Sequence, residues 1–147
     1  MRVVLDTNVL INSTSDPFSA ATQLLEAAVA GEITALATPA VKREYKNIVG
    51  KLVNQPEDSE LIENFLSSLH DVRAESTEVI IDDLEDLKFI EAAVGGDADV
   101  IITSDKHLLD VGEVEAVRII SPTEAVAGLN EDGGEWHQWA KGLGIGQ

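Results

Sequence analysis

Five short apolar runs alternate along this chain with longer segments in which apolar residues recur at helical spacing. The strand-like runs comprise residues 2–5, 33–38, 77–81, 99–105 and 117–121. The helix-like segments comprise residues 18–32, 39–52, 57–69, 83–96 and 122–129. A helix between successive strands lets those strands lie parallel in one sheet, with the helices covering its faces. The alternation therefore predicts an α/β fold around a central parallel sheet.

Glycine and proline mark the ends of several expected helices. Gly31 is placed to cap the C-terminus of the first helix. Thr38 followed by Pro39 is a good helix start, with threonine as the N-cap and proline in the first helical position. Pro56 interrupts the helical pattern that follows, so residues 39–52 and 57–69 are expected to form separate helices.

The composition is that of a globular chain. The 147 residues suit one domain with a substantial core, and 44% of them are hydrophobic at a mean hydropathy of +0.04. The absence of cysteine excludes a disulfide framework and a thiolate metal site. No apolar run approaches the roughly 18 residues of a membrane span, and the N-terminus has no signal-peptide pattern. We therefore expect a cytoplasmic protein of prokaryotic type that does not associate with membranes.

The composition changes near residue 130. Residues 130–147 hold five of the 11 glycines and both tryptophans, Trp136 and Trp139. We expect a folded domain at residues 1–129, followed by a flexible or loosely docked tail at residues 130–147. The two tryptophans could share one face of a short helix there.

The net charge of −17 is distributed unevenly. Residues 1–55 carry five basic and five acidic residues, whereas residues 56–147 carry five basic and 22 acidic residues. This balance argues against a general nucleic-acid coat protein. Four of the basic residues lie in the segment KREYKNIVGK, where a solvated helix face and a small positive surface beside an acidic site are both reasonable interpretations.

Two predicted strands end in an acid. Asp6 follows VVL and Asp105 follows VIITS, and the carboxyl ends of parallel strands are where α/β proteins bind ligands. Glu44 lies in a helix after the second strand, and Asp86 lies in the first turn of the helix after residues 77–81. For each acid alone, a turn cap or a solvated surface group is the more common role. If the sheet is doubly wound, however, all four acids converge on one edge.

Converging carboxylates repel each other unless they are protonated or bridged by a cation. A site with oxygen ligands and without histidine or cysteine favours Mg²⁺ or Mn²⁺. Such ions often bind phosphate oxygens as well, so the predicted chemistry is metal-assisted hydrolysis of a phosphodiester.

Four segments resemble the PIN-domain ribonucleases, and more narrowly the PIN-family toxins of prokaryotic toxin–antitoxin systems. They are VVLDTNVLI, TPAVKREYKNIV, DLKFIEAAVGGDADVIITSDKHLL and IISPTEAV, and the resemblance covers about residues 2–128. It implies a three-layer α/β/α fold around a parallel sheet, with a set of acids that binds Mg²⁺ or Mn²⁺. The sequence departs from the family pattern at Leu84, where proline is common, and at Ser104, where glycine is common.

The resemblance also assigns individual residues. Asp6, Glu44, Asp86 and Asp105 match the four family acids, which are both metal ligands and catalytic residues. Asp86 is chosen over Asp82, Asp83 and Glu85 because it keeps the family spacing to Phe89. Polar residues expected to contact substrate or support the ligands are Asn8, Thr103, Ser104 and Asp99, although Asp99 starts its strand and is expected to be structural or to support the ligands indirectly. Candidates for RNA backbone contacts are Lys42, Arg43 and Lys46.

The expected function is that of an Mg²⁺- or Mn²⁺-dependent ribonuclease, acting as the toxin of a toxin–antitoxin pair. Its expected partners are an RNA substrate, an antitoxin protein and a second copy of the chain in a homodimer. The alternative is a catalytically silent PIN-fold binding or regulatory module. An aspartyl-nucleophile phosphatase is disfavoured because it requires an acid at the position that Asn8 occupies.

Overall fold

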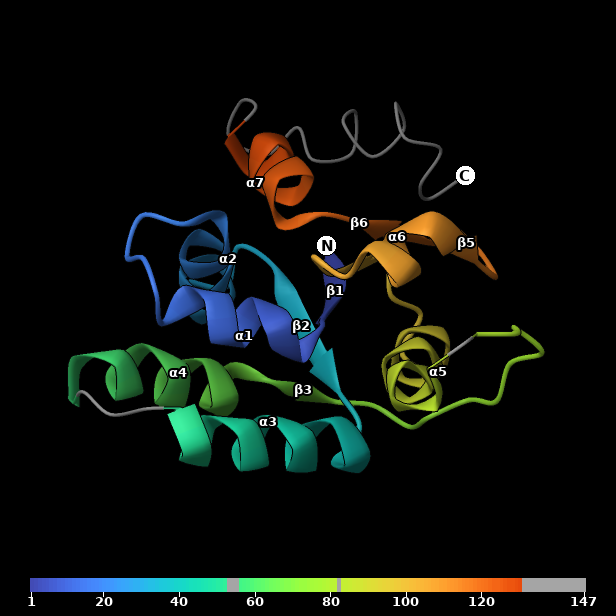
Figure 1. The fold of residues 1–147 in the computed structure, drawn as a ribbon, viewed down its shortest axis with the longest axis horizontal. Helices are drawn as coiled ribbons and strands as arrows, with labels where there is room; N and C mark the ends of the chain where they lie inside the picture. Colours follow the sequence, from blue (N-terminus) through green and yellow to red (C-terminus); the bar gives the residue numbers. More distant parts are fainter. Residues whose placement is uncertain (53–55, 82, 131–147) are drawn as a thin grey trace.

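The computed structural model describes residues 1–52, 56–81 and 83–130, and its chain alternates strands with helices (Figure 1). The strands are β1 (Arg2–Leu5), β2 (Thr34–Ala37), β3 (His70–Asp71), β4 (Val100–Ile102), β5 (Glu113–Val114) and β6 (Val117–Ile120). The α-helices are α1 (Thr7–Ser13), α2 (Ala20–Val29), α3 (Pro39–Leu52), α4 (Pro56–Ser68), α5 (Leu87–Gly95), α6 (Lys106–Val111) and α7 (Pro122–Asn130). A 3₁₀ turn, η1 (Leu84–Asp86), leads into α5.

The strands form one sheet in the order β3-β2-β1-β4-β6-β5. Every pairing is parallel except that of the short edge strand β5 with β6. The chain builds outward from β1 through β2 to β3, and then returns to place β4 on the other side of β1. The strand order therefore reverses between β1 and β4, which is the position where doubly wound sheets bind ligands.

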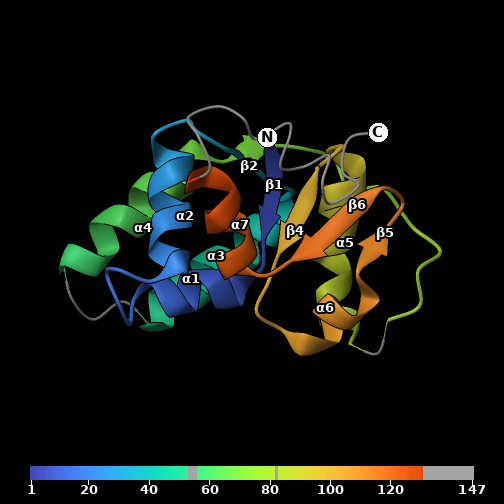
Figure 2. The ribbon, with the colours of Figure 1, turned by 90° about the horizontal axis from the view of Figure 1, so that it is seen from above.

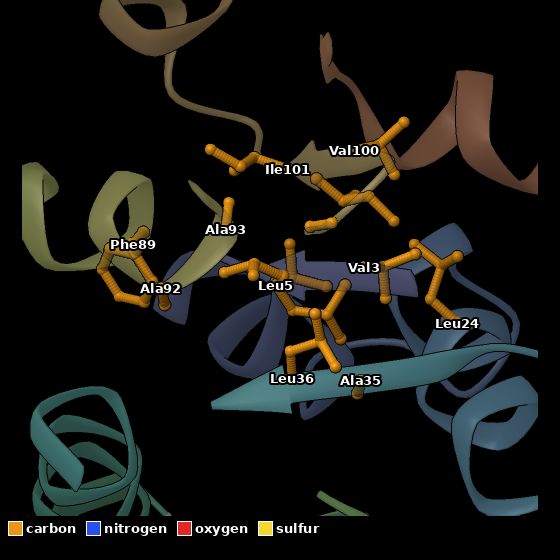
Figure 3. Packing of buried hydrophobic residues seen from close by; sticks show 14 of the residues in the cluster. Val3, Leu5, Leu24, Ala35, Leu36, Phe89, Ala92, Ala93, Val100 and Ile101 are labelled. Carbon is orange, nitrogen blue, oxygen red and sulfur yellow. The ribbon is translucent and has the colours of Figure 1, made fainter. Parts of the chain in front are cut away.

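Helices lie on both sides of this sheet, as Figures 1 and 2 show. Val3, Val4 and Leu5 point alternately to opposite faces of β1, and all three are fully buried. Side chains from β1, β2, β4, α2 and α5 meet in the core (Figure 3). The α/β fold with helices around a mostly parallel sheet is thus confirmed, and the buried strands explain why their sequences are continuously apolar.

The predicted helix signals at Gly31, Thr38 and Pro39 are confirmed, whereas the strand predicted at residues 99–105 is shorter and spans only Val100–Ile102. Gly31 follows α2 with φ of +80°, a conformation that glycine adopts without steric cost. Thr38 caps α3, since its Oγ1 accepts a hydrogen bond of 3.2 Å from the amide of Val41. Proline 39 is the first residue of that helix.

The predicted strand at residues 77–81 is wrong. Residues 77–81 have no regular secondary structure, and the side chain of Ile80 is 92% exposed. The edge position beside β2 is taken instead by β3, two exposed residues whose sequence carries no strand pattern. The short elements α1, α6 and β5 lie in segments for which the sequence predicts no helix or separate strand.

The tail lies largely outside the described residues. Asn130 is the last residue of α7, and Trp136 and Trp139 fall beyond the described part of the chain. Within the described ranges, no helix has the length and apolar character needed to cross a membrane.

Candidate active site

Three carboxylates meet where the strand order reverses. Oxygen atoms of Asp6, Asp86 and Asp105 all lie within 4.8 Å of one another. Asp6 directly follows β1, and Asp105 lies three residues beyond the end of neighbouring strand β4. The third residue, Asp86, ends η1 at the start of α5. We call these three residues the acidic triad.

Asp6 is the most buried member of the triad, with 6% of its surface exposed. Its amide continues the sheet by donating to the carbonyl of Ile102, which fixes the backbone. Its Oδ2 accepts hydrogen bonds from Thr103 Oγ1 at 2.6 Å and from Asn8 Nδ2 at 3.0 Å. Burial raises the pKa of Asp6, and the hydrogen bond from Thr103 partly opposes that rise. Although Asp6 occupies the N-cap position of α1, its side chain makes no capping hydrogen bond, so the carboxylate is directed to the triad.

Thr103 connects two members of the triad. It is fully buried, and its Oγ1 donates to Asp6 while accepting a hydrogen bond of 2.9 Å from the amide of Asp105. Asp105 in turn caps α6, because its Oδ1 accepts from the amide of His107 at 2.9 Å. Asn8 is tied to the same loop, since its Oδ1 accepts from the amide of Ser104 at 3.3 Å. The structure thus brings the predicted residues Asn8, Thr103 and Ser104 to the triad.

Asp86 is the third acid of the triad. Burial, followed by the negative charges of Asp6 and Asp105, raises the pKa of Asp86 to about 6. The neighbouring Asp83 accepts a hydrogen bond of 2.9 Å from the amide of Glu85 and so caps η1. Asp82 lies outside the described residues. The predicted strand that was to place Asp86 is absent, yet the start of α5 brings Asp86 to the expected edge.

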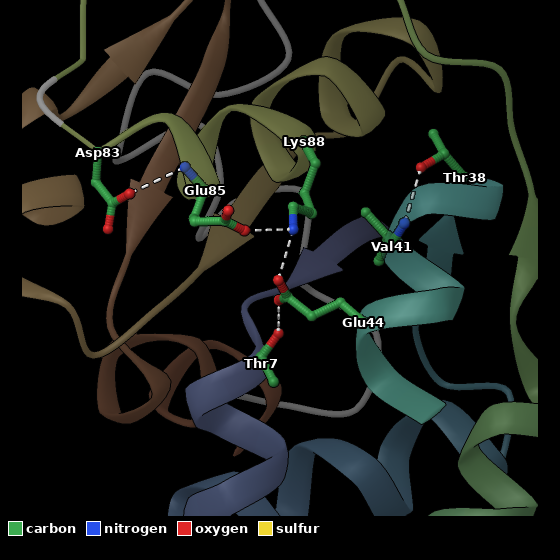
Figure 4. Close-up of polar contacts among 7 residues, drawn as sticks. All are labelled: Thr7, Thr38, Val41, Glu44, Asp83, Glu85 and Lys88. Atoms are coloured by element: carbon green, nitrogen blue, oxygen red, sulfur yellow. Dashed lines mark hydrogen bonds and ion pairs between the residues drawn. The ribbon is translucent and has the colours of Figure 1, made fainter. Parts of the chain in front are cut away.

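Glu44 lies beside the triad rather than in it. One of its carboxylate oxygens accepts a hydrogen bond from Thr7 Oγ1, and the other lies 2.6 Å from Lys88 Nζ (Figure 4). Lys88 also pairs with Glu85 at 2.8 Å. The fully buried neighbour Tyr45 donates its hydroxyl to the carbonyl of Leu5, which holds α3 against the end of β1. Glu44 therefore has a fixed position next to Asp6.

The remaining predicted residues separate into distinct environments. Lys42 forms an ion pair with Asp71 of β3. Arg43 and Lys46 instead line an open surface hollow of about 690 Å³ between α3 and the start of α5. Asp99 lies at the opposite end of β4, where its Oδ2 accepts a hydrogen bond of 2.9 Å from the amide of Arg2, which ties the start of β1 to β4.

The sequence reasoning missed Thr7, Tyr45 and Lys88. Thr7 and Tyr45 each adjoin a predicted acid in the sequence, and Lys88 follows Asp86 by two positions. Their partners, however, come from other elements, so the sequence offered no direct signal of these contacts.

The donor chemistry of the triad fits a hard divalent cation. Three carboxylate oxygens that converge within 4.8 Å offer the oxygen ligation that Mg²⁺ and Mn²⁺ prefer. Burial is the main cause of the raised pKa of both Asp6 and Asp86, and the negative charges of neighbouring carboxylates add to the rise. A bound cation would remove this repulsion.

Comparisons with known proteins agree with this architecture. A family model described as "PIN domain" matches residues 2–107. Among solved structures, the fold is similar to a chain in the crystal structure of VapBC2 from Rickettsia felis bound to a DNA fragment from their promoter. That similarity has a TM-score of 0.58 at 16% sequence identity, and it covers 82% of this chain and 98% of the other. No curated protein matches the sequence.

Proposed function

Because this chain belongs to the PIN-domain family, we propose that it is an Mg²⁺- or Mn²⁺-dependent ribonuclease and the toxin of a toxin–antitoxin pair. The observation that carries the proposal is the acidic triad, whose oxygen atoms converge within 4.8 Å at the reversal of strand order. The family match and the fold shared with a VapBC2 chain support the nuclease and toxin assignments.

The triad residues would hold the cation. A bound Mg²⁺ or Mn²⁺ would supply Lewis-acid chemistry, lowering the pKa of water and stabilising negative charge on phosphate oxygens. Thr103 and Asn8 fix the orientation of the Asp6 carboxylate through its Oδ2. Asp105 is restrained by the amide of His107, so two of the three ligands are oriented before the ion binds.

Glu44 has a supporting role in this proposal. Its charge is compensated by Lys88, and its position beside the triad suits contact with the ion through water or help in holding a second ion. With water as the nucleophile, the products would carry a 5′-phosphate and a 3′-hydroxyl. A product with a 2′,3′-cyclic phosphate would contradict this part of the proposal.

The proposed partners follow from the toxin assignment. We expect an antitoxin protein to bind over the triad and inhibit it, and we expect the toxin to act in the cytoplasm as a homodimer. Coexpression with the protein encoded by the adjacent gene tests the first point, because an antitoxin should copurify with this chain and suppress cleavage.

The catalytic proposal is tested with purified full-length protein and a 5′-labelled RNA. Cleavage should require Mn²⁺ or Mg²⁺, stop in EDTA and be lost in Asp6→Asn, whose melting temperature in EDTA should not fall below that of the wild type. The matched control is Asp110→Asn, which removes the charge of an exposed aspartate in α6. Wild-type cleavage activity in Asp6→Asn would contradict the proposed nuclease function.

Thermal melts of the same two proteins, combined with the cleavage assay, distinguish an enzyme from a catalytically silent module. Mn²⁺ should raise the melting temperature of the wild type by mass action, and Asp6→Asn should lose that response. A wild-type protein that gains stability with Mn²⁺ yet cleaves no RNA would favour the binding or regulatory alternative.

A further inference from the structure

Lys88 lies between two carboxylates that come from different helical segments. Its Nζ is 2.6 Å from Glu44 Oε1 of α3 and 2.8 Å from Glu85 Oε2 of η1 (Figure 4). Two carboxylate oxygens that converge on one point form a position for a cation, and the ammonium of Lys88 fills it here. We call the space between Glu44 Oε1 and Glu85 Oε2 the lysine position.

The lysine position adjoins the acidic triad. Glu85 directly precedes Asp86 in the sequence, and the second carboxylate oxygen of Glu44 accepts a hydrogen bond from Thr7, which directly follows Asp6. The negative charge of Glu44 is also near enough to contribute to the raised pKa of Asp86. The site thus offers cations two neighbouring positions, one at the triad and one between Glu44 and Glu85.

The two positions differ in how their negative charge is balanced. Among the described residues, Lys88 forms ion pairs with Glu44 and Glu85, whereas the acidic triad forms no ion pair with a basic side chain. The side chains of Glu44 and Lys88 are also partly shielded from solvent, at 22% and 24% exposed. A divalent cation is therefore drawn to the uncompensated triad, and it would have to displace an ammonium to enter the lysine position.

An ammonium and a divalent cation cannot share the lysine position. A carboxylate oxygen binds Mg²⁺ at about 2.0–2.1 Å, so an ion held by Glu44 Oε1 would lie beside the Lys88 ammonium, where the two positive charges repel each other. Both carboxylate oxygens of Glu44 are already engaged, one by Lys88 and the other by Thr7. Glu44 is thus kept from ligating an ion directly while Lys88 is in place.

We propose that the Lys88 ammonium takes the place of a second divalent cation, so that the site binds a single Mg²⁺ or Mn²⁺ at the acidic triad. Lys88 is a positioning residue in this role: it balances the charges of Glu44 and Glu85 and holds Glu44 where it reaches the ion only through water. The charge at the lysine position is then independent of the metal supply, because a lysine ammonium stays protonated at neutral pH. The inference deepens the proposed nuclease function and rests on it.

The test counts bound Mn²⁺ on the full-length protein without RNA. The electron paramagnetic resonance signal of free Mn²⁺ is followed as the metal is added to metal-free protein, because bound Mn²⁺ loses this sharp signal. The wild type should bind a single Mn²⁺ per chain. Lys88→Met, which keeps an unbranched side chain but removes the ammonium, should bind a second Mn²⁺ between Glu44 and Glu85. A wild type that binds a second Mn²⁺ as tightly as the first would overturn the proposal.

Further variants show whether the additional ion depends on Glu44 and on the charge of Lys88. Lys88→Met combined with Glu44→Gln removes the ammonium and one carboxylate, and it should again bind a single Mn²⁺. Lys88→Arg keeps the positive charge and should keep the wild-type count. The proposal fails if folded Lys88→Met gains no ion, or if the additional ion binds equally tightly in the double variant. Lys88→Gln replaces Lys88→Met in this test if the methionine variant does not fold.

The control is Lys51→Met, which removes an exposed lysine near the C-terminal end of α3. It changes the net charge as Lys88→Met does, but it leaves the lysine position intact. It should therefore bind a single Mn²⁺, as the wild type does. Gain of a second ion in Lys51→Met would show that the count follows net charge, and it would refute the role assigned to Lys88.

Failure of this inference is distinguishable from failure of the nuclease proposal. If the wild type binds a single Mn²⁺ and cleaves RNA but Lys88→Met gains no ion, the nuclease proposal survives and Lys88 only joins α3 to α5. If Lys88→Met gains an ion that depends on Glu44 while neither protein cleaves RNA, the role of Lys88 survives and the catalytic proposal fails.

Discussion

Removing one acid from the triad should stabilise the metal-free protein. We consider Asp86→Asn, which keeps the size of the side chain but removes a charge close to those of Asp6 and Asp105. In the native protein the pKa of Asp86 rises from 3.8 to about 6. A raised pKa means that the folded state holds the proton more tightly than the unfolded state does.

The sign of the effect follows from proton linkage. Between the unfolded and folded pKa values the native state binds more protons, so stability falls as the pH rises from about 4 to above 6. The penalty is absent at low pH and complete above the folded pKa. Two pKa units correspond to about 3 kcal/mol at most, at ~1.36 kcal/mol per unit. Because Asp86 is only partly buried, solvent screening reduces the expected gain of Asp86→Asn to about 1 kcal/mol at pH 7.5.

Thermal melts in EDTA at pH 4 and pH 7.5 measure this gain. For a chain of this size, about 1 kcal/mol corresponds to a rise in melting temperature of roughly 2–4 °C. The rise should occur at pH 7.5 and largely disappear at pH 4, and Asp110→Asn should show no comparable rise. In Mn²⁺ the order should reverse, because only the wild type gains the full stabilisation from metal binding. A metal-free Asp86→Asn variant that melts at or below the wild-type temperature at pH 7.5 would refute the reasoning.

Three further predictions concern the scaffold and are checked by urea or thermal unfolding. Tyr45→Phe loses the buried hydrogen bond to the Leu5 carbonyl and should cost about 1–3 kcal/mol, because that acceptor is left buried; an unchanged free energy of unfolding would contradict that role. Gly95→Ala should be strongly destabilising, since its Cβ would lie 1.8 Å from the Arg73 carbonyl oxygen, whereas Gly50→Ala in α3 meets nothing within 4 Å and should stabilise by about 0.5–1 kcal/mol. Similar effects at both glycines would show that the close approach is not rigid. Ala116→Gly should stabilise by up to about 1 kcal/mol by relieving a φ of 72°, and a loss of stability would contradict this.

The sequence predicts the central strands well because they are buried on both faces. A strand such as β1 or β4 must be continuously apolar, so its pattern is unambiguous. Residues 77–81 have a similar composition, but Val79 and Ile81 pack only partly against the core while Ile80 is exposed. Local pattern cannot reveal that β3, formed by His70 and Asp71, occupies the adjacent edge, since that pairing depends on tertiary contacts.

In the candidate site, too, some residues can be predicted from the sequence and some contacts cannot. Asp6 and Asp105 are recognisable because each acid follows a buried strand, and the topology then brings the two together. The pairing of Glu44 with Lys88 joins α3 to α5, and the hydroxyl of Tyr45 joins α3 to β1. Such contacts depend on the packing of helices around the sheet, which the spacing of residues along one helix does not encode.

The pairing of β1 with β4 also has a consequence for when the site can exist. Thr103 and Asp6, which share a hydrogen bond at the triad, are 97 positions apart in the sequence. During synthesis from the N-terminus, Asp6 emerges long before its partners, and no local segment can assemble the triad. Contacts between such distant residues form late because the intervening chain must be ordered first. An incomplete chain on the ribosome would therefore carry the first acid without the assembled triad, so the proposed nuclease could not attack RNA before its own synthesis was nearly complete.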